Sequence, residues 1–203
     1  MRQLTLLLLA LLLTACGGGS KVVKEFEDPA YDGQMTKILL LLPNLFPQSN
    51  QYTREKIVEE LESRGMAVAV RSDFFGASER LTREKLIAAI ADSDVDGVLL
   101  VDLEGAMRED RGRASFADAR GTYADFEDEI GYILSVGGNI APVYRETQTD
   151  VFLRVRLFPE STKKLAWEQF LQFSNPGSVY DLVDKAAPVI AGKVAASGIV
   201  ARN

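Results

Sequence analysis

The sequence predicts an α/β fold, namely a mixed sheet with a parallel β-α-β-α-β half, an antiparallel hairpin half and a C-terminal helix. Three observations predict it. The first half of the chain alternates short apolar runs with segments of helical period, which is typical of parallel strands joined by helices. The second half holds two apolar, strand-like runs around a polar turn, which is typical of an antiparallel hairpin. A last segment of helical period follows, so we expect a helix to cover one face of the sheet.

The parallel half begins with KILLLL at residues 37–42, a nearly continuous apolar run that Pro43 closes. Such a run is typical of a strand buried on both faces. The segment YTREKIVEELESRG follows, in which Thr53 can cap a helix and Gly65 can end it. Residues 66–70, MAVAV, are then expected to form the second strand.

The same pattern recurs further along the chain. Thr82 can cap a second helix with an apolar stripe, and residues 97–103 are expected to form a third buried strand. The tetrapeptide Thr-Arg-Glu-Lys occurs at 53–56 and again at 82–85, which indicates shared helix-start chemistry. Strands and helices alternating at these lengths predict right-handed crossovers and a parallel sheet.

The antiparallel half begins with strict alternation in DVFLRVRLF, where Arg154 and Arg156 share a face that we expect to be partly in water. A polar turn, PESTKK, leads to a second run at 165–173, in which Trp167 is expected to pack in the core. The preceding segment, residues 131–149, is expected to supply one or two further strands.

The final segment is predicted to be helical. Ser178 and Asp181 form a box-like helix start. Pro188 lies inside the segment and is expected to kink or split the helix, because proline lacks the N–H that a helix interior needs.

Composition excludes several classes of function. The chain has no histidine and one cysteine, so it can form neither a histidine-containing triad nor a histidine metal site. It has no phosphate-binding or dinucleotide-binding glycine motif, and no cofactor is predicted. The net charge of −6 opposes binding to nucleic acid or to an anionic membrane surface.

The N-terminus has the order of a secretory signal. Arg2 precedes an apolar run over residues 4–13 that is too short to span a bilayer, and small residues follow it. Leu13-Thr14-Ala15-Cys16 resembles a bacterial lipobox. The resemblance implies that residues 1–15 are a lipoprotein signal peptide, that Cys16 carries acyl chains that hold the protein in a lipid bilayer, and that Gly17 directs it to the outer membrane, facing the periplasm.

Residues 16–36 are rich in glycine and charge and are interpreted as the lipidated cysteine and a flexible tether. Residues 37–203 are predicted to form a single α/β domain. Its strand–helix order and its late hairpin with a tryptophan resemble the small α/β domain of envelope lipoproteins and assembly factors, such as the amino-terminal domain of TolB and the LpoB-type synthase activators. This resemblance implies a role in binding another envelope protein.

Candidate site residues follow the carboxyl ends of the parallel strands, where α/β sheets place their ligands. One group could be an exposed surface for a protein partner: Phe46, Phe74, Phe75 and Arg108. The other group could bind Mg²⁺ or Ca²⁺ and consists of Asp73, Asp102 and Glu104. Helix capping and ordinary loop contacts are the simpler explanation for these carboxylates.

Three functions remain open on these observations. The first is a non-catalytic, membrane-anchored binding or accessory module for another envelope component. The second is a carboxylate- or metal-dependent envelope hydrolase, and the third is a carrier of a small apolar ligand.

Overall fold

The computed structural model of the 203-residue chain describes residues 19–43, 45, 49–76, 79, 82–108 and 149–202. Cys16 and residues 131–148 lie outside these ranges. The described elements are, in order, β1 (Ser20–Glu27), β2 (Lys37–Leu41), α2 (Asn50–Glu62), β3 (Ala67–Val70), the short 3₁₀ helix η2 (Arg71–Asp73), α3 (Arg83–Ala91), β4 (Gly97–Arg108), β5 (Thr149–Pro159), β6 (Trp167–Ser174) and α5 (Val179–Ser197).

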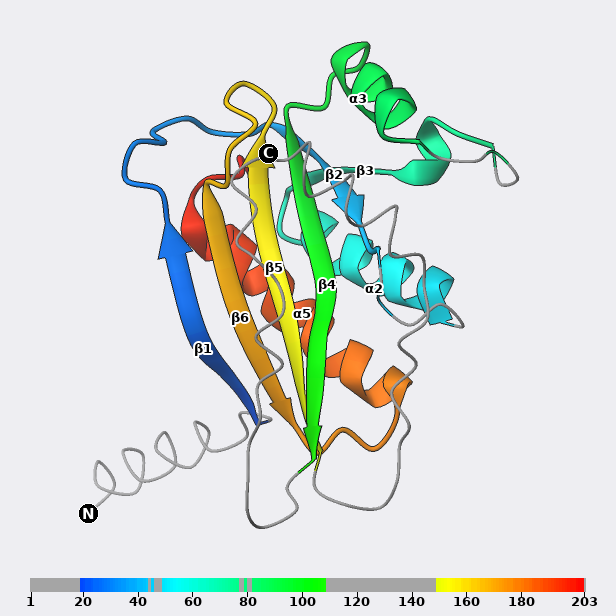
Figure 1. Ribbon diagram of the computed structural model, residues 1–203, viewed down its shortest axis with the longest axis vertical. Helices are drawn as coiled ribbons and strands as arrows, with labels where there is room; N and C mark the ends of the chain where they lie inside the picture. The colour runs from blue at the N-terminus through cyan, green and yellow to red at the C-terminus, as the bar shows by residue number, and fades with distance from the viewer. Residues whose placement is uncertain are drawn as a thin grey trace, which may run out of the picture.

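The six strands form one mixed sheet in the order β1-β6-β5-β4-β2-β3 (Figure 1). Strand β2 is parallel to both of its neighbours, β3 and β4. The β4–β5, β5–β6 and β6–β1 pairs are antiparallel. The predicted combination of a parallel half, an antiparallel hairpin and a C-terminal helix is confirmed.

Helices cover the two faces of the sheet unequally. On one face α2 and α5 pack over a large apolar cluster that includes Leu40, Leu99 and the buried Trp167. On the other face α3 packs over a smaller cluster that includes Leu39 and Leu100. The alternation of Leu39 and Leu40 between the two clusters explains why β2 is apolar throughout, since both of its faces are buried.

Helix α5 is continuous from Val179 to Ser197 with Pro188 inside it, so the expected split does not occur. The helix buries a row of residues against the sheet, including Leu182, Ala186 and Ile190. This apolar packing offsets the hydrogen bond that proline removes. Among the described residues, no helix has both the length and the apolar character needed to cross a bilayer.

The interpretation as a flexible tether is wrong for residues 20–27, which form strand β1. The strand pairs with β6 from Ser20 opposite Phe173 to Glu27 opposite Trp167, with one irregularity in register between Val22 and Lys24. The physical reason is that the hairpin leaves the outer edge of β6 with free backbone N–H and C=O groups, which β1 satisfies. Met35, also assigned to the tether, is buried and bridges Val200 after α5.

Candidate functional site

Four strands meet at the end of the sheet where β1 begins. Ser20 pairs with Phe173, Phe173 with Val151, and Val151 with Ala106, so these residues form one row across β1, β6, β5 and β4. We call this region the β1-start end. It is the lower end of the sheet in Figure 1, and α5 also begins there.

The β1-start end lies close in sequence to Cys16. Ser20 is the fourth residue after Cys16. A fully extended chain of that length spans at most about 14 Å, whatever its conformation. Because Ser20 is part of the sheet, Cys16 can lie no further than this distance from the β1-start end.

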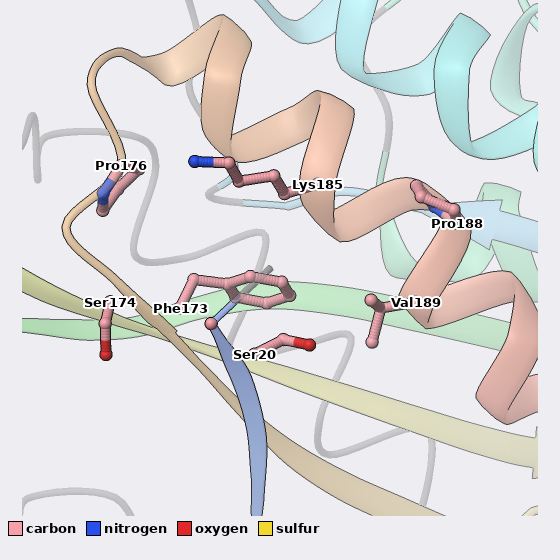
Figure 2. Close-up of a pocket in the computed structure, with 8 residues that line it drawn as sticks. Ser20, Phe173, Ser174, Pro176, Lys185, Pro188 and Val189 are labelled. Carbon is pink, nitrogen blue, oxygen red and sulfur yellow. The ribbon is translucent and has the colours of Figure 1, made fainter. Parts of the chain in front are cut away.

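A pocket of about 230 Å³ opens at the β1-start end, between the sheet and α5 (Figure 2). The sheet contributes the start of β1 and the end of β6, and the helix contributes its middle turns. Its lining residues are Gly19, Ser20, Phe173, Ser174, Pro176, Lys185, Pro188 and Val189.

The walls of this pocket are mainly apolar. Phe173 and Pro176 are buried, while Pro188 and Val189 are half-buried. Figure 2 shows Phe173 and Val189 in the space between the strand ends and the helix. Pro188 has no N–H, so its residue offers no backbone donor to an occupant.

The single charged side chain of the lining has a partner. The Lys185 ammonium lies 2.8 Å from the carboxylate of Asp181, one turn earlier on α5. The Asp181 carboxylate also accepts a hydrogen bond of 2.8 Å from the Gly177 N–H. The bond from Lys185 and then that from Gly177 lower the pKa of Asp181 below its ordinary value. With its charge held by Asp181, Lys185 can present its aliphatic stem to the pocket.

The face of the antiparallel half that lies away from α5 was expected to be partly exposed to solvent, but it holds buried ion pairs instead. Arg154 and Arg156 are only 6% and 1% exposed. The Arg154 guanidinium lies 2.6 Å from the Glu168 carboxylate, and that of Arg156 lies 3.0 Å from Asp102. The arginines are tolerated there because each is paired with a carboxylate on a neighbouring strand.

The predicted carboxylate group does not gather at one edge of the sheet. Strand β4 continues to Arg108 instead of ending near Leu103, so Asp102 and Glu104 lie within the strand. Asp102 pairs with Arg156, and the Asp73 carboxylate accepts a 2.8 Å hydrogen bond from the Val70 N–H. Within the described ranges, no group of three or more carboxylate or cysteine side chains could hold a metal ion.

The predicted partner-binding residues are only partly described. Phe46 and the side chain of Arg108 lie outside the described residues. Phe74 and Phe75 are half-buried, with ring centroids 6.3 Å apart, and both pack against the apolar cluster beneath α3. Their use as a partner surface stays a prediction.

The structure also separates these phenylalanines from the pocket. They follow β3, whose last residue, Val70, is level with Leu99 of β4. Leu99 is seven residues from Ala106, which corresponds to roughly 20 Å along a strand. Phe74 and Phe75 therefore do not belong to the β1-start end.

Sequence reasoning missed the pocket because its lining comes from three separate parts of the chain. Residues 19–20, 173–176 and 185–189 meet only when β1 joins the sheet. The one local signal is Pro188, an interruption in an otherwise regular apolar helix.

The sequence matches no protein-family model and no curated protein. Among solved structures, the chain is similar to the PelC dodecamer of Paraburkholderia phytofirmans, with a TM-score of 0.48, 10% identity, and coverage of 84% of this chain and 94% of that chain. It is also similar to a lipoprotein of Neisseria meningitidis, with a TM-score of 0.38, 13% identity, and coverage of 79% and 99%. A minor lipoprotein of Acinetobacter baumannii gives a TM-score of 0.32, 8% identity, and coverage of 80% and 94%. Similarities of this strength carry no argument about function, and the resemblance to TolB and the LpoB-type activators stays a prediction.

Proposed function

We propose that the protein is a bacterial envelope lipoprotein, anchored through acylated Cys16, that acts as a non-catalytic binding or accessory module for another envelope component. The lipobox-like Leu13-Thr14-Ala15-Cys16 after a short apolar run carries this proposal. Two or more acyl chains hold a protein stably in a bilayer, whereas one holds it only marginally. Gly17 after the cysteine supports an outer-membrane location facing the periplasm.

A binding role is favoured over catalysis by the state of the polar residues. The chain has no histidine. The carboxylates of Asp73 and Asp102, which a hydrolase would need, bind the protein's own backbone and Arg156. The described residues thus offer no supporting geometry for the alternative of a carboxylate- or metal-dependent hydrolase.

The anchor is tested by the mass of the N-terminal peptide of the protein purified from its own membrane. We expect a peptide that begins at Cys16 and carries a diacylglycerol thioether and an amide-linked acyl chain. The control is Cys16→Ser, which should carry no lipid. A bare thiol at Cys16, or an intact leader before it, would contradict the proposal.

The location is tested by separating the inner and outer membranes. We expect the wild-type protein in the outer-membrane fraction. Gly17→Asp should move it to the inner membrane without changing its lipid, because the resemblance assigns the sorting signal to this position. Equal distribution of the two proteins would contradict the outer-membrane assignment.

The partner surface is tested by photo-crosslinking in cells from residues introduced at Phe46, Phe74 or Phe75. We expect one envelope protein to be captured at these positions. Glu55, an exposed residue of α2, is a matched control and should capture nothing specific. The same capture pattern at all four positions would count against a surface at these phenylalanines.

A second candidate function, carriage of a small apolar ligand, is favoured by the apolar pocket between β1 and α5. Native mass spectrometry of the purified protein is the direct measurement. A bound mass that denaturation releases would support this function, and its absence would oppose it.

A further inference from the structure

We propose that the pocket between β1 and α5 takes up one of the acyl chains carried by Cys16. The inference rests on the proposed lipidation of Cys16. It assigns the pocket an occupant that belongs to the protein itself and not to a passing ligand.

The first argument is reach. Gly19 and Ser20 line the pocket, and Gly19 is three residues from Cys16. An extended chain of three residues spans at most about 11 Å. An acyl chain that starts at Cys16 is therefore held at high effective concentration beside the opening, which favours its entry over that of a free lipid.

The second argument is the chemistry of the walls. An acyl chain needs apolar surface and makes no hydrogen bonds along its length. The pocket offers the side chains of Phe173, Pro188 and Val189, and the backbone at Pro188 presents no N–H. The charge of Lys185 is neutralised by Asp181, 2.8 Å away, so it imposes no demand for a polar ligand.

The third argument is that one acyl chain can enter the pocket while the other acyl chains of Cys16 stay in the bilayer. A pocket and a bilayer both remove apolar groups from water, so the part of the acyl chain that the pocket covers loses little on moving between them. The other two chains of a triacylated Cys16 would still hold the protein in the bilayer. A chain that enters the pocket would hold α5 and the β1-start end against the membrane, so the described fold would have a definite orientation.

The test uses the full-length protein in its own cells, fed with a fatty acid that carries a diazirine. After irradiation, the protein is purified and its crosslinked peptides are mapped by tandem mass spectrometry. We expect the acylated N-terminal peptide to be joined to a peptide that contains Phe173 or Val189 of the same chain.

Variants that fill the pocket provide the controls. Val189→Trp should reduce the internal crosslink by at least about fivefold, because an indole occupies the space that the acyl chain needs. Ala196→Trp, at an exposed position of the same helix, should leave the yield unchanged. Should Val189→Trp fail to fold, Ser20→Trp fills the pocket from the start of β1, since Ser20 pairs with Phe173 and its side chain lies on the same face of the sheet (Figure 2).

The outcomes separate this inference from the proposed function. If Cys16 incorporates no fatty acid, the proposed lipidation fails and the inference fails with it. If Cys16 is acylated but crosslinks only to bilayer lipid or to other proteins, the inference alone is overturned. A pocket peptide whose adduct has the mass of a phospholipid or a free fatty acid also overturns it, and would favour the carrier function.

Discussion

Gly97, the first residue of β4, leaves the space that Met35 fills. A Cβ atom at residue 97 would overlap Sδ of Met35 and lie 2.8 Å from its Cγ. The Met35 side chain has little space to move into, because it is buried. Its backbone is held as well, since its N–H donates to the Ile199 carbonyl and its carbonyl accepts from the Ala201 N–H, each at 2.7 Å. This contact joins the segment after β1 to the segment after α5.

We expect Gly97→Ala to lower the free energy of unfolding by about 1–3 kcal/mol, the usual cost of overpacking a core. Urea denaturation measures the change. The same substitution in a Met35→Ala background should cost much less, since the clashing side chain is gone. An equal cost in both backgrounds would show that the contact with Met35 is not the cause.

Glu168 stands between two cations on the face opposite α5. Its carboxylate lies 2.6 Å from the guanidinium of Arg154 and 3.9 Å from the ammonium of Lys24. Both cations also lie over the ring of Phe170, 5.1 and 5.4 Å from its centroid. The two pairs differ in burial, because the Arg154 side chain is 7% exposed and that of Lys24 is 63% exposed.

We expect Glu168→Gln to lower the free energy of unfolding by about 3 kcal/mol, because it leaves the buried Arg154 without an anion. Lys24→Gln should cost at most about 1 kcal/mol, since an exposed ion pair contributes little. Thermal or urea unfolding of both variants gives the comparison. Similar losses of stability for the two substitutions would show that the burial of Arg154 does not determine the energetic cost.

At the scale of elements, the start of α5 behaves as its sequence predicts. Ser178 precedes the helix, and its Oγ accepts a hydrogen bond of 3.1 Å from the Asp181 N–H. The Asp181 carboxylate in turn binds Gly177 and Lys185, so the first turns of the helix and the turn before it are joined.

Because these bonds lower the pKa of Asp181, folding favours its charged form. The resulting stability is fully present above the unfolded pKa of about 3.9 and is lost as pH falls through the lower pKa of the folded state. We expect wild type to be more stable than Asp181→Asn at neutral pH and this difference to shrink in acid. Urea denaturation at several pH values measures it, and a difference independent of pH would contradict the assignment.

Most elements could be predicted because their signals are local. Strands β2 and β4 have nearly continuous apolar runs, and α3 has a threonine N-cap, Thr82. Strand β1 could not, because SKVVKEFE has three apolar residues among eight and its partner, β6, lies far away in sequence. The burial of Arg154 escaped prediction for a similar reason, since its partner Glu168 lies on another strand. The pocket depends on β1 and was missed with it.

At the scale of the whole molecule, β1 converts the expected tether into part of the sheet. It shields the outer edge of β6, from Trp167 to Phe173, from solvent. An exposed strand edge would present unpaired N–H and C=O groups to other chains. The position of β1 therefore bears on both the stability of the fold and its tendency to associate.

We expect replacement of residues 20–27 by a Gly-Ser segment of equal length to lower the free energy of unfolding by at least about 2 kcal/mol, because the hydrogen bonds to β6 are lost. The amides of β6 that face β1 should also exchange with deuterium faster. The control replaces the tripeptide at 17–19, before the strand, with serines, and should change neither quantity. Unchanged exchange in β6 would mean that residues 20–27 act only as a tether.

The pairing of β1 with β6 also has a mechanical consequence. If the chain is held at Cys16 and the body is drawn away from the bilayer, the force enters at the first residue of β1 and runs along the strand. Antiparallel hydrogen bonds lie across the strand direction, so this force loads the ladder from Ser20 to Glu27 all at once and does not open it one bond at a time. With the proposed anchor at Cys16, the pairing of β1 with β6 would therefore resist in shear a force that pulls the body away from the bilayer.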